Sequence, residues 1–173
     1  MPAKPPRRRL AIRRSSYNTK RRLIELPLEP SATLALLGRI RFEGSGKHKL
    51  EPRAFDLAPA PSDGDDTYCD GHADFTPQEV SRIPDLIQRG IRANLLDARS
   101  SHDDPLLIWT IDDNGWIYEG KLTNPGQGIY HGYPVLPTDP LAKTLIRRYG
   151  DWVNAQNEPA LSASFEAALE RYR

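Results

Sequence analysis

Cysteine is nearly absent from this sequence, because Cys69 is the one cysteine among 173 residues. A single thiol excludes an internal disulfide framework and any zinc finger that needs several cysteines. Chains without disulfides are typical of reducing compartments, so we expect a cytoplasmic protein.

Long hydrophobic runs are also missing. No apolar stretch approaches the roughly 18 residues that a transmembrane helix needs. The N-terminus is basic and lacks the apolar stretch of roughly 7–15 residues found in a secretory signal. We therefore expect neither a membrane-spanning segment nor a membrane partner.

Proline and glycine, by contrast, are plentiful, at 16 and 12 residues, while 38% of the chain is hydrophobic. This composition is sufficient for a core and predicts a fold rich in loops. At roughly 100–200 residues per domain, the chain accommodates one domain. We place it at residues 23–173, behind a basic arm of residues 1–22 that has too few apolar side chains to fold alone and is expected to be flexible.

The net charge of +1 conceals a strong asymmetry along the chain. Residues 1–53 hold 14 Lys and Arg against 4 Asp and Glu, a net +10. Residues 54–104 hold 4 against 11, a net −7, and residues 105–173 hold 6 against 8, a net −2. The basic end indicates RNA or another polyanion as a partner, a contact with the acidic middle of the chain, or a solvated tail.

An Asn114-Gly115 pair between two apolar runs predicts a β-hairpin over residues 106–123. A two-residue turn at this pair opposes Trp109 to Gly120. In this register the large apolar side chains share one face of the hairpin, and Glu119 lies on the other.

Residues 128–136 continue as a third strand that ends near Pro134, which cannot donate to a strand ladder. Helical patterns and capping residues predict helices before Gly38, after Thr76, after Asp139 and at the C-terminus. The fold class is therefore α+β, a small antiparallel meander of three or more strands with helices packed on one face.

The segment Gly44-Ser45-Gly46-Lys47-His48-Lys49 is the first candidate for chemistry. The neighbouring lysines favour the neutral imidazole of His48, which is the form a general base needs. The ammonium groups of Lys47 and Lys49 can meet a phosphate or stabilise a developing negative charge. The alternative is a flexible basic loop, and the spacing of a phosphate-binding P-loop is absent.

The second candidate is the strand Tyr130-His131-Gly132-Tyr133-Pro134. A strand within a sheet can hold His131 firmly enough for acid catalysis. Tyr130 and Tyr133 can stack on a base or donate a hydrogen bond. The alternative is a half-buried aromatic strand in which the histidine bonds a neighbour.

A third segment, residues 63–74, is acidic and contains Cys69 and His72 at a spacing seen in zinc sites. This pair is half of a site, and the acids do not follow the spacing of a calcium-binding EF-hand loop, so we assign no metal ligands. No serine nucleophile motif is present, and the acidic surroundings of Cys69 disfavour a reactive thiolate.

The Gly46-Lys47-His48 segment, the meander and the Tyr130–Pro134 strand together resemble the metal-independent ribonucleases of the barnase, EndoU, tRNA-cleaving colicin and RelE group, common among bacterial toxins. The resemblance covers residues 44–136 at most and includes neither a full EndoU pattern nor the Glu-Arg-His order of barnase. It implies RNA cleavage through the 2′-hydroxyl without a metal or other cofactor. Carried over, His48 and His131 are the acid–base pair, and Lys47 or Arg53 lies at the scissile phosphate.

The first hypothesis is thus a ribonuclease-like toxin or effector, with His48, His131 and Lys47 catalytic and with Lys49, Arg53, Tyr130 and Tyr133 binding RNA. A second hypothesis is a non-enzymatic subunit of a bacterial defence or nucleoprotein complex, which docks through its basic arm and aromatic strands onto a protein partner such as an antitoxin. A third is an ADP-ribosyltransferase that uses His48, Tyr118 and Glu119.

Overall fold

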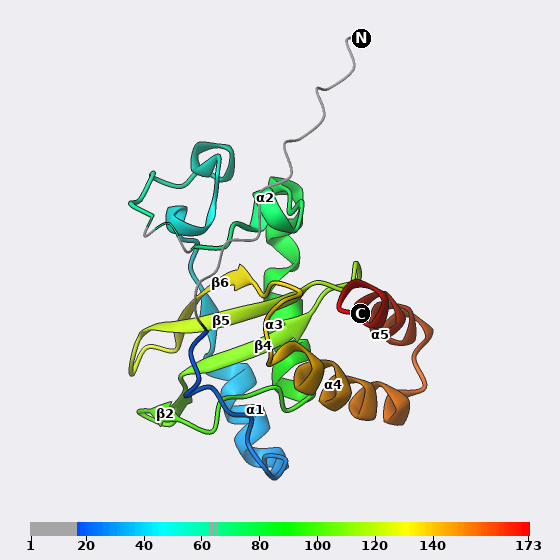
Figure 1. Cartoon of the computed structure of the whole chain (residues 1–173). Helices are drawn as coiled ribbons and strands as arrows, with labels where there is room; N and C mark the ends of the chain where they lie inside the picture. The colour runs from blue at the N-terminus through cyan, green and yellow to red at the C-terminus, as the bar shows by residue number, and fades with distance from the viewer. Residues whose placement is uncertain (1–16, 63, 65) are drawn as a thin grey trace.

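The chain contains both helices and strands, and most of its strands follow one another without an intervening helix, which confirms the α+β class (Figure 1). The computed structural model describes residues 17–62, 64 and 66–173. Within these residues lie five α-helices, three 3-10 helices, a four-stranded sheet and a two-stranded ribbon. The helices are α1 (Pro30–Arg39), η1 (Gly46–His48), η2 (Pro52–Phe55), α2 (Cys69–His72), η3 (Pro77–Arg82), α3 (Ile83–Arg92), α4 (Ala142–Gln156) and α5 (Pro159–Arg171).

The four-stranded sheet has the order β1-β6-β5-β4. Strand β4 (Leu107–Ile111) pairs antiparallel with β5 (Ile117–Asn124), which pairs antiparallel with β6 (Ile129–Pro134). Strand β1 (Arg41–Phe42) joins β6 in parallel, so the sheet is mixed rather than wholly antiparallel as predicted. The ribbon is formed by β2 (Ser100–Ser101) and β3 (Asp104–Pro105).

The turn between β4 and β5 is one residue longer than the predicted two-residue turn, so Trp109 opposes Glu119 and not Gly120. The Asp112 carboxylate accepts two backbone N–H groups of the turn, and Gly115 adopts a φ of +78°. A left-handed glycine at this place is typical of three-residue hairpin turns. Because side chains alternate between faces, the shift by one residue moves Trp109 onto the face of Glu119.

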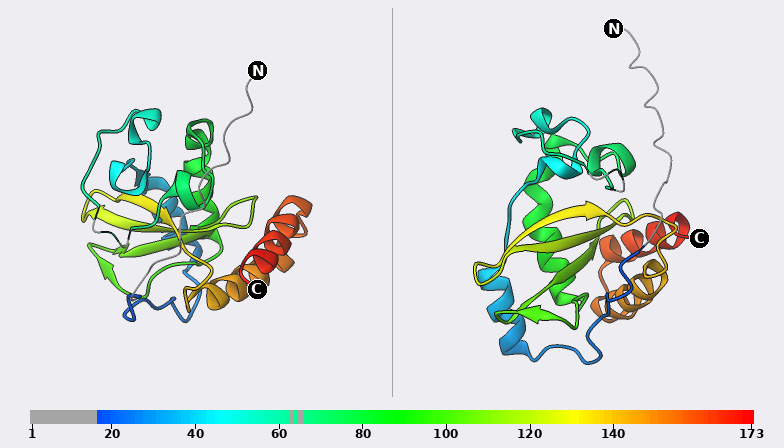
Figure 2. Two further views of the ribbon diagram at one scale, coloured as in Figure 1. Left: turned by 45° about the horizontal axis from the view of Figure 1, so that its top comes forward. Right: turned by 60° about the vertical axis from the view of Figure 1, so that its left-hand side comes forward.

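Helices cover both faces of the sheet, whereas the sequence predicts them on one (Figure 2). Helices α1 and α3 pack against the face that carries Ile108, Leu122 and Tyr130. Helices α4 and α5 pack against the opposite face at Trp109 and Ile117. The one-face prediction fails because β4 is buried along its whole length, and a strand buried on both faces needs a cover on each.

The described residues of the segment 44–75 form only η1, η2 and α2 as regular elements and lie above β6 in the view of Figure 1. The sequence predicts a long stretch without sustained periodicity at this place. Stretches of such length are usually functional or disordered. In the structure this segment contacts the sheet and contributes to the site described below.

Residues 1–16 of the predicted basic arm lie outside the described residues. Of the remaining arm residues, Arg21 is only 7% exposed, and Leu23 forms a β-bridge with Asp97 in the domain. The domain thus includes Arg21. No helix in the described part of the chain is long and apolar enough to cross a membrane.

Candidate functional site

The pairing of β5 with β6 gathers polar side chains on one face of the sheet. His131 opposes Lys121, and Tyr133 opposes Glu119. Side chains of directly paired residues share a face, as do residues two apart along a strand. This face is distinct from the face of Tyr130 and Gly132, which is turned toward α3.

The edge of β6 beyond its pairing with β1 provides the attachment for residues 44–75. The Thr67 hydroxyl donates to the Pro134 carbonyl at 2.8 Å, and the Cys69 thiol donates to the Gly132 carbonyl at 3.6 Å. These side-chain bonds take the place of a further strand, because buried carbonyls of a sheet edge need donors. They hold the irregular segment against the strand that carries His131.

Within this segment, the 3-10 helix η1 carries His48. Gly46 begins η1 and passes so near the Ala58 carbonyl that a Cβ would lie 1.9 Å from its oxygen. The Ser45 hydroxyl accepts the Lys47 amide at 3.4 Å and caps the turn. The glycine at this position thus permits close packing of the chain upon itself.

The imidazole of His48 meets that of His131 across the edge of β6. The two ring centres are 5.4 Å apart, with planes inclined by 13°, and the Tyr133 ring centre is 4.5 Å from that of His48. A separation of 5.4 Å is about twice the length of one hydrogen bond. One anionic group could therefore accept hydrogen bonds from both imidazoles.

His48 is held as a neutral ring with a defined tautomer. Its Nδ1 is 3.1 Å from the Thr67 carbonyl oxygen. A carbonyl can only accept, so Nδ1 carries the hydrogen and Nε2 keeps its lone pair. Burial lowers the pKa of His48 below 6.5, although the bond to Thr67 opposes the shift. Nε2 is thus a proton acceptor near neutral pH.

His131 is partly exposed, and its Nδ1 is 2.7 Å from the Thr123 hydroxyl. A hydroxyl can donate or accept, so this contact permits both tautomers and the protonated ring. Burial, together with the charges of His48 and Lys121, lowers the pKa of His131 to about 4. An anion bound beside these groups would reverse the electrostatic part of this shift.

Tyr133 is fixed by a buried ionic network. Its hydroxyl donates to Glu119 Oε1 at 2.6 Å, while Glu119 Oε2 accepts from Trp109 Nε1 and from Arg21, both at 2.8 Å. Arg21 also forms two hydrogen bonds with Asp139, at 2.8 and 2.9 Å. Burial disfavours the charge of Arg21, but its bonds to the two carboxylates outweigh this cost and raise its pKa. The network orients the Tyr133 ring that packs on His48.

Lys47 and Lys49 contact groups other than the two imidazoles, although their charges help to lower the pKa of both rings. Lys47 lies 3.7 Å from Asp66 in an ion pair, and Arg53 is exposed on η2. Lys49 is 9% exposed and turns toward Cys69 and the Phe55 ring. The side chain of Lys49 is thus directed to Cys69 and Phe55, and its binding of RNA stays a prediction.

Tyr130, predicted to bind substrate, is a core residue with 1% exposure, and its hydroxyl donates to the Pro105 carbonyl. Tyr130 directly precedes His131 on β6, so its side chain lies on the opposite face of the sheet. The predicted set His48, Tyr118 and Glu119 is not assembled either, because consecutive strand residues point to opposite faces. Nothing in this geometry supports ADP-ribosyl transfer.

Three residues of this region were not assigned to a site from the sequence: Arg21, Lys121 and Thr123. Lys121 is exposed beside His131, and no ion pair or side-chain hydrogen bond of its ammonium is found among the described residues. Knowledge of the register between β5 and β6 would have placed Glu119 and Lys121 beside Tyr133 and His131. No sequence signal distinguishes Arg21 from the other basic residues of the arm.

Cys69 and His72 do not converge on a common point. The thiol faces Gly132, and His72 Nδ1 accepts the Tyr68 amide at 2.9 Å. Over residues 17–62, 64 and 66–173, no group of three or more His, Cys, Asp or Glu side chains could hold a metal ion.

Comparison of the chain with protein-family models, with curated proteins and with solved structures found no match.

Because Thr67 attaches residues 44–75 to β6, we expect Thr67→Val to lower the stability of the protein substantially. This variant keeps the shape of the side chain but leaves the Pro134 carbonyl without its donor, which costs about 1–3 kcal/mol. Urea unfolding should show this loss, and thermolysin should cleave within residues 44–75 faster than in the wild type.

Thr67→Ser is the matched control, because it retains the hydroxyl and should lose about 1 kcal/mol or less. Equal stability and equal proteolysis of the two variants would contradict the role of the Thr67 hydroxyl at the strand edge.

Proposed function

We propose that this protein cleaves RNA without a metal, by transfer of the phosphate onto the neighbouring 2′-hydroxyl. The observation that carries the proposal is the juxtaposition of two imidazoles, from distant parts of the chain, with ring centres 5.4 Å apart. Two titratable groups beside one phosphate supply the base and the acid that this reaction needs.

His48 is the general base in this proposal. Its Nε2 lone pair takes the proton of the 2′-hydroxyl, and the oxygen then attacks the adjacent phosphorus. The hydrogen bond from Nδ1 to the Thr67 carbonyl at 3.1 Å stabilises the imidazolium that forms. Tyr133 packs on the ring and is a positioning residue, because its hydroxyl is engaged by Glu119.

His131 is the general acid. Its imidazolium gives a proton to the 5′-oxygen as the bond from phosphorus to that oxygen breaks, which leaves a 2′,3′-cyclic phosphate and a 5′-hydroxyl. A pKa of about 4 disfavours the imidazolium in the empty site. The negative charge of a bound phosphate favours it, so substrate binding itself prepares the acid.

Lys121 is the cation nearest to this chemistry by register, since it pairs directly with His131 and is exposed. An ammonium group there neutralises part of the charge that develops on the phosphate. The net +10 of residues 1–53 is consistent with a polyanionic substrate, whose binding would weaken with salt.

Substitution of either imidazole tests the proposal. In the presence of EDTA, His48→Ala and His131→Ala should each lower kcat/KM for a short RNA by about 10²–10⁴-fold, the usual contribution of one acid or base. The product of the wild type should carry a 2′,3′-cyclic phosphate.

The control is His102→Asn, which alters an exposed histidine in the turn between β2 and β3. This variant should cleave as the wild type does. Wild-type rates from both alanine variants, or no cleavage by the wild type together with tight binding of a protein partner, would overturn the proposal in favour of a docking role.

The lowered pKa values also predict an acidic optimum for kcat/KM. At a pH below the pKa of His48 that ring is protonated and no base remains, whereas well above pH 6.5 both rings are neutral and no acid remains. The rate should therefore be highest between these limits and fall about tenfold for each unit above the higher pKa. Stopped assays from pH 4 to pH 9, with circular dichroism to confirm folding, measure this profile. A rate that rises from pH 6.5 to pH 8.5 would contradict it.

A further inference from the structure

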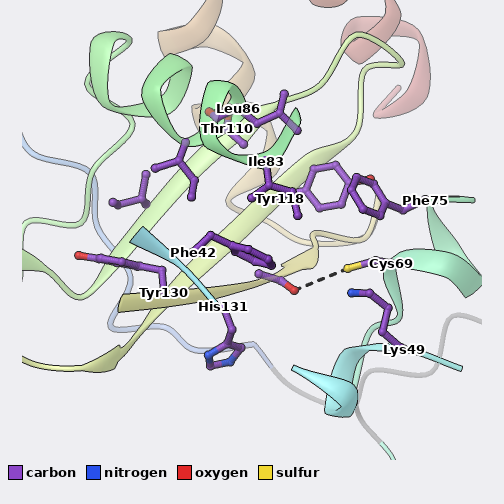
Figure 3. A pocket seen from close by; sticks show the side chains of 14 residues that line it. Phe42, Lys49, Cys69, Phe75, Ile83, Leu86, Thr110, Tyr118, Tyr130 and His131 are labelled. Carbon is purple, nitrogen blue, oxygen red and sulfur yellow. Dashed lines mark hydrogen bonds between the residues drawn. The ribbon is translucent and has the colours of Figure 1, made fainter. Parts of the chain in front are cut away.

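A cavity lies between the sheet and α3, on the face opposite the two imidazoles. Its volume is about 60 Å³, several times the roughly 10–15 Å³ that one water molecule requires. Apolar side chains form most of its wall: Phe42, Phe75, Ile83, Leu86, Ile108 and Tyr118. Figure 3 shows the His131 ring pointing away from this cavity on the far side of β6. The imidazole thus points out of the cavity, although His131 is one of the residues that border it.

Lys49 places a charge at the wall of this apolar space. Its side chain points toward Cys69 in Figure 3, and the residue is 9% exposed. The partners found for its ammonium are the Cys69 thiol and the Phe55 ring, 5.1 Å from the ring centre. No carboxylate forms an ion pair with Lys49 within the described residues. Buried charges are normally paired with an opposite charge. Lys49 has no such counter-ion among the described residues.

Tyr118 supplies a second unsatisfied group. Its ring lines the cavity, and its hydroxyl is buried without a hydrogen-bond partner among the residues that the structure describes. Buried hydroxyls are almost always paired with protein or with a bound molecule. An apolar space whose wall holds an ammonium without a carboxylate partner and an unpaired hydroxyl has the chemistry of a ligand site.

We propose that this cavity binds a small apolar carboxylic acid, whose carboxylate pairs with Lys49 and whose hydrocarbon part contacts the aromatic and aliphatic wall. The ammonium of Lys49 favours an anionic group on the ligand, and the apolar wall of the cavity favours a hydrocarbon part. A carboxylate on a single ring or a short chain satisfies both within the available volume. Strand β6 lies between the body of the cavity and the imidazoles, and His131 borders the cavity from that strand.

Benzoate and its uncharged analogue benzamide form a matched pair of probes for the wild-type protein. Benzoate should bind about tenfold more tightly, because only the carboxylate makes a charge-assisted hydrogen bond to Lys49. Titration followed by protein NMR gives both affinities, and the shifted signals should include Phe75, Leu86 and Ile108.

Lys49→Met keeps the length of the side chain and removes its charge, so it should abolish the preference for benzoate. Lys47→Met, an equal change two residues away beside Asp66, should retain the preference. Equal affinity of the wild type for the two probes, no binding of benzoate, or shifts confined to Lys121 and His131 would each overturn the proposal. These outcomes leave the cleavage assays unaffected, so the two proposals fail separately.

Discussion

The unpaired edge of β6 is the constraint from which the candidate site follows. The strand is covered by β1 only at Ile129 and Tyr130, and its later carbonyls are satisfied by Thr67 and Cys69. A buried strand edge without donors is costly, so the irregular segment is bound where these side chains can reach it. His48 lies in that segment and bonds the carbonyl of Thr67. One residue thus closes the sheet through its hydroxyl and orients the candidate base through its backbone.

On the side of the site where Tyr133 lies, a network of buried charged residues holds the structure. Glu119 receives hydrogen bonds from Tyr133, Trp109 and Arg21, and Arg21 is paired with Asp139. Buried ion pairs contribute little net stability, but loss of one partner leaves an uncompensated charge. The network therefore fixes one arrangement of the Tyr133 ring, against which His48 packs. A rigid tyrosine on one side and a strand edge on the other leave the imidazoles little freedom.

Much of the fold and part of the candidate site could be predicted from the sequence. The features that could not be predicted have physical reasons. The α+β class, the strand from residue 128 and the shared face of His131 and Tyr133 follow from local alternation. The register of the hairpin depends on Asp112 accepting two turn amides, which the Asn114-Gly115 pair alone does not reveal. The pairing of β1 with β6, and the direction that Lys49 takes, are long-range events without a local signal.

The two sides of β6 thus carry different chemistry, a polar site with two neutral imidazoles and an apolar cavity with one buried ammonium. The central claim is that both imidazoles act on one phosphate. A crystal structure with a 2′-deoxy dinucleotide, which lacks the attacking hydroxyl, tests it most directly. The account predicts the phosphate within about 2.6–3.2 Å of Nε2 of both His48 and His131. A phosphate bound elsewhere, or in contact with only one of the two rings, would contradict it.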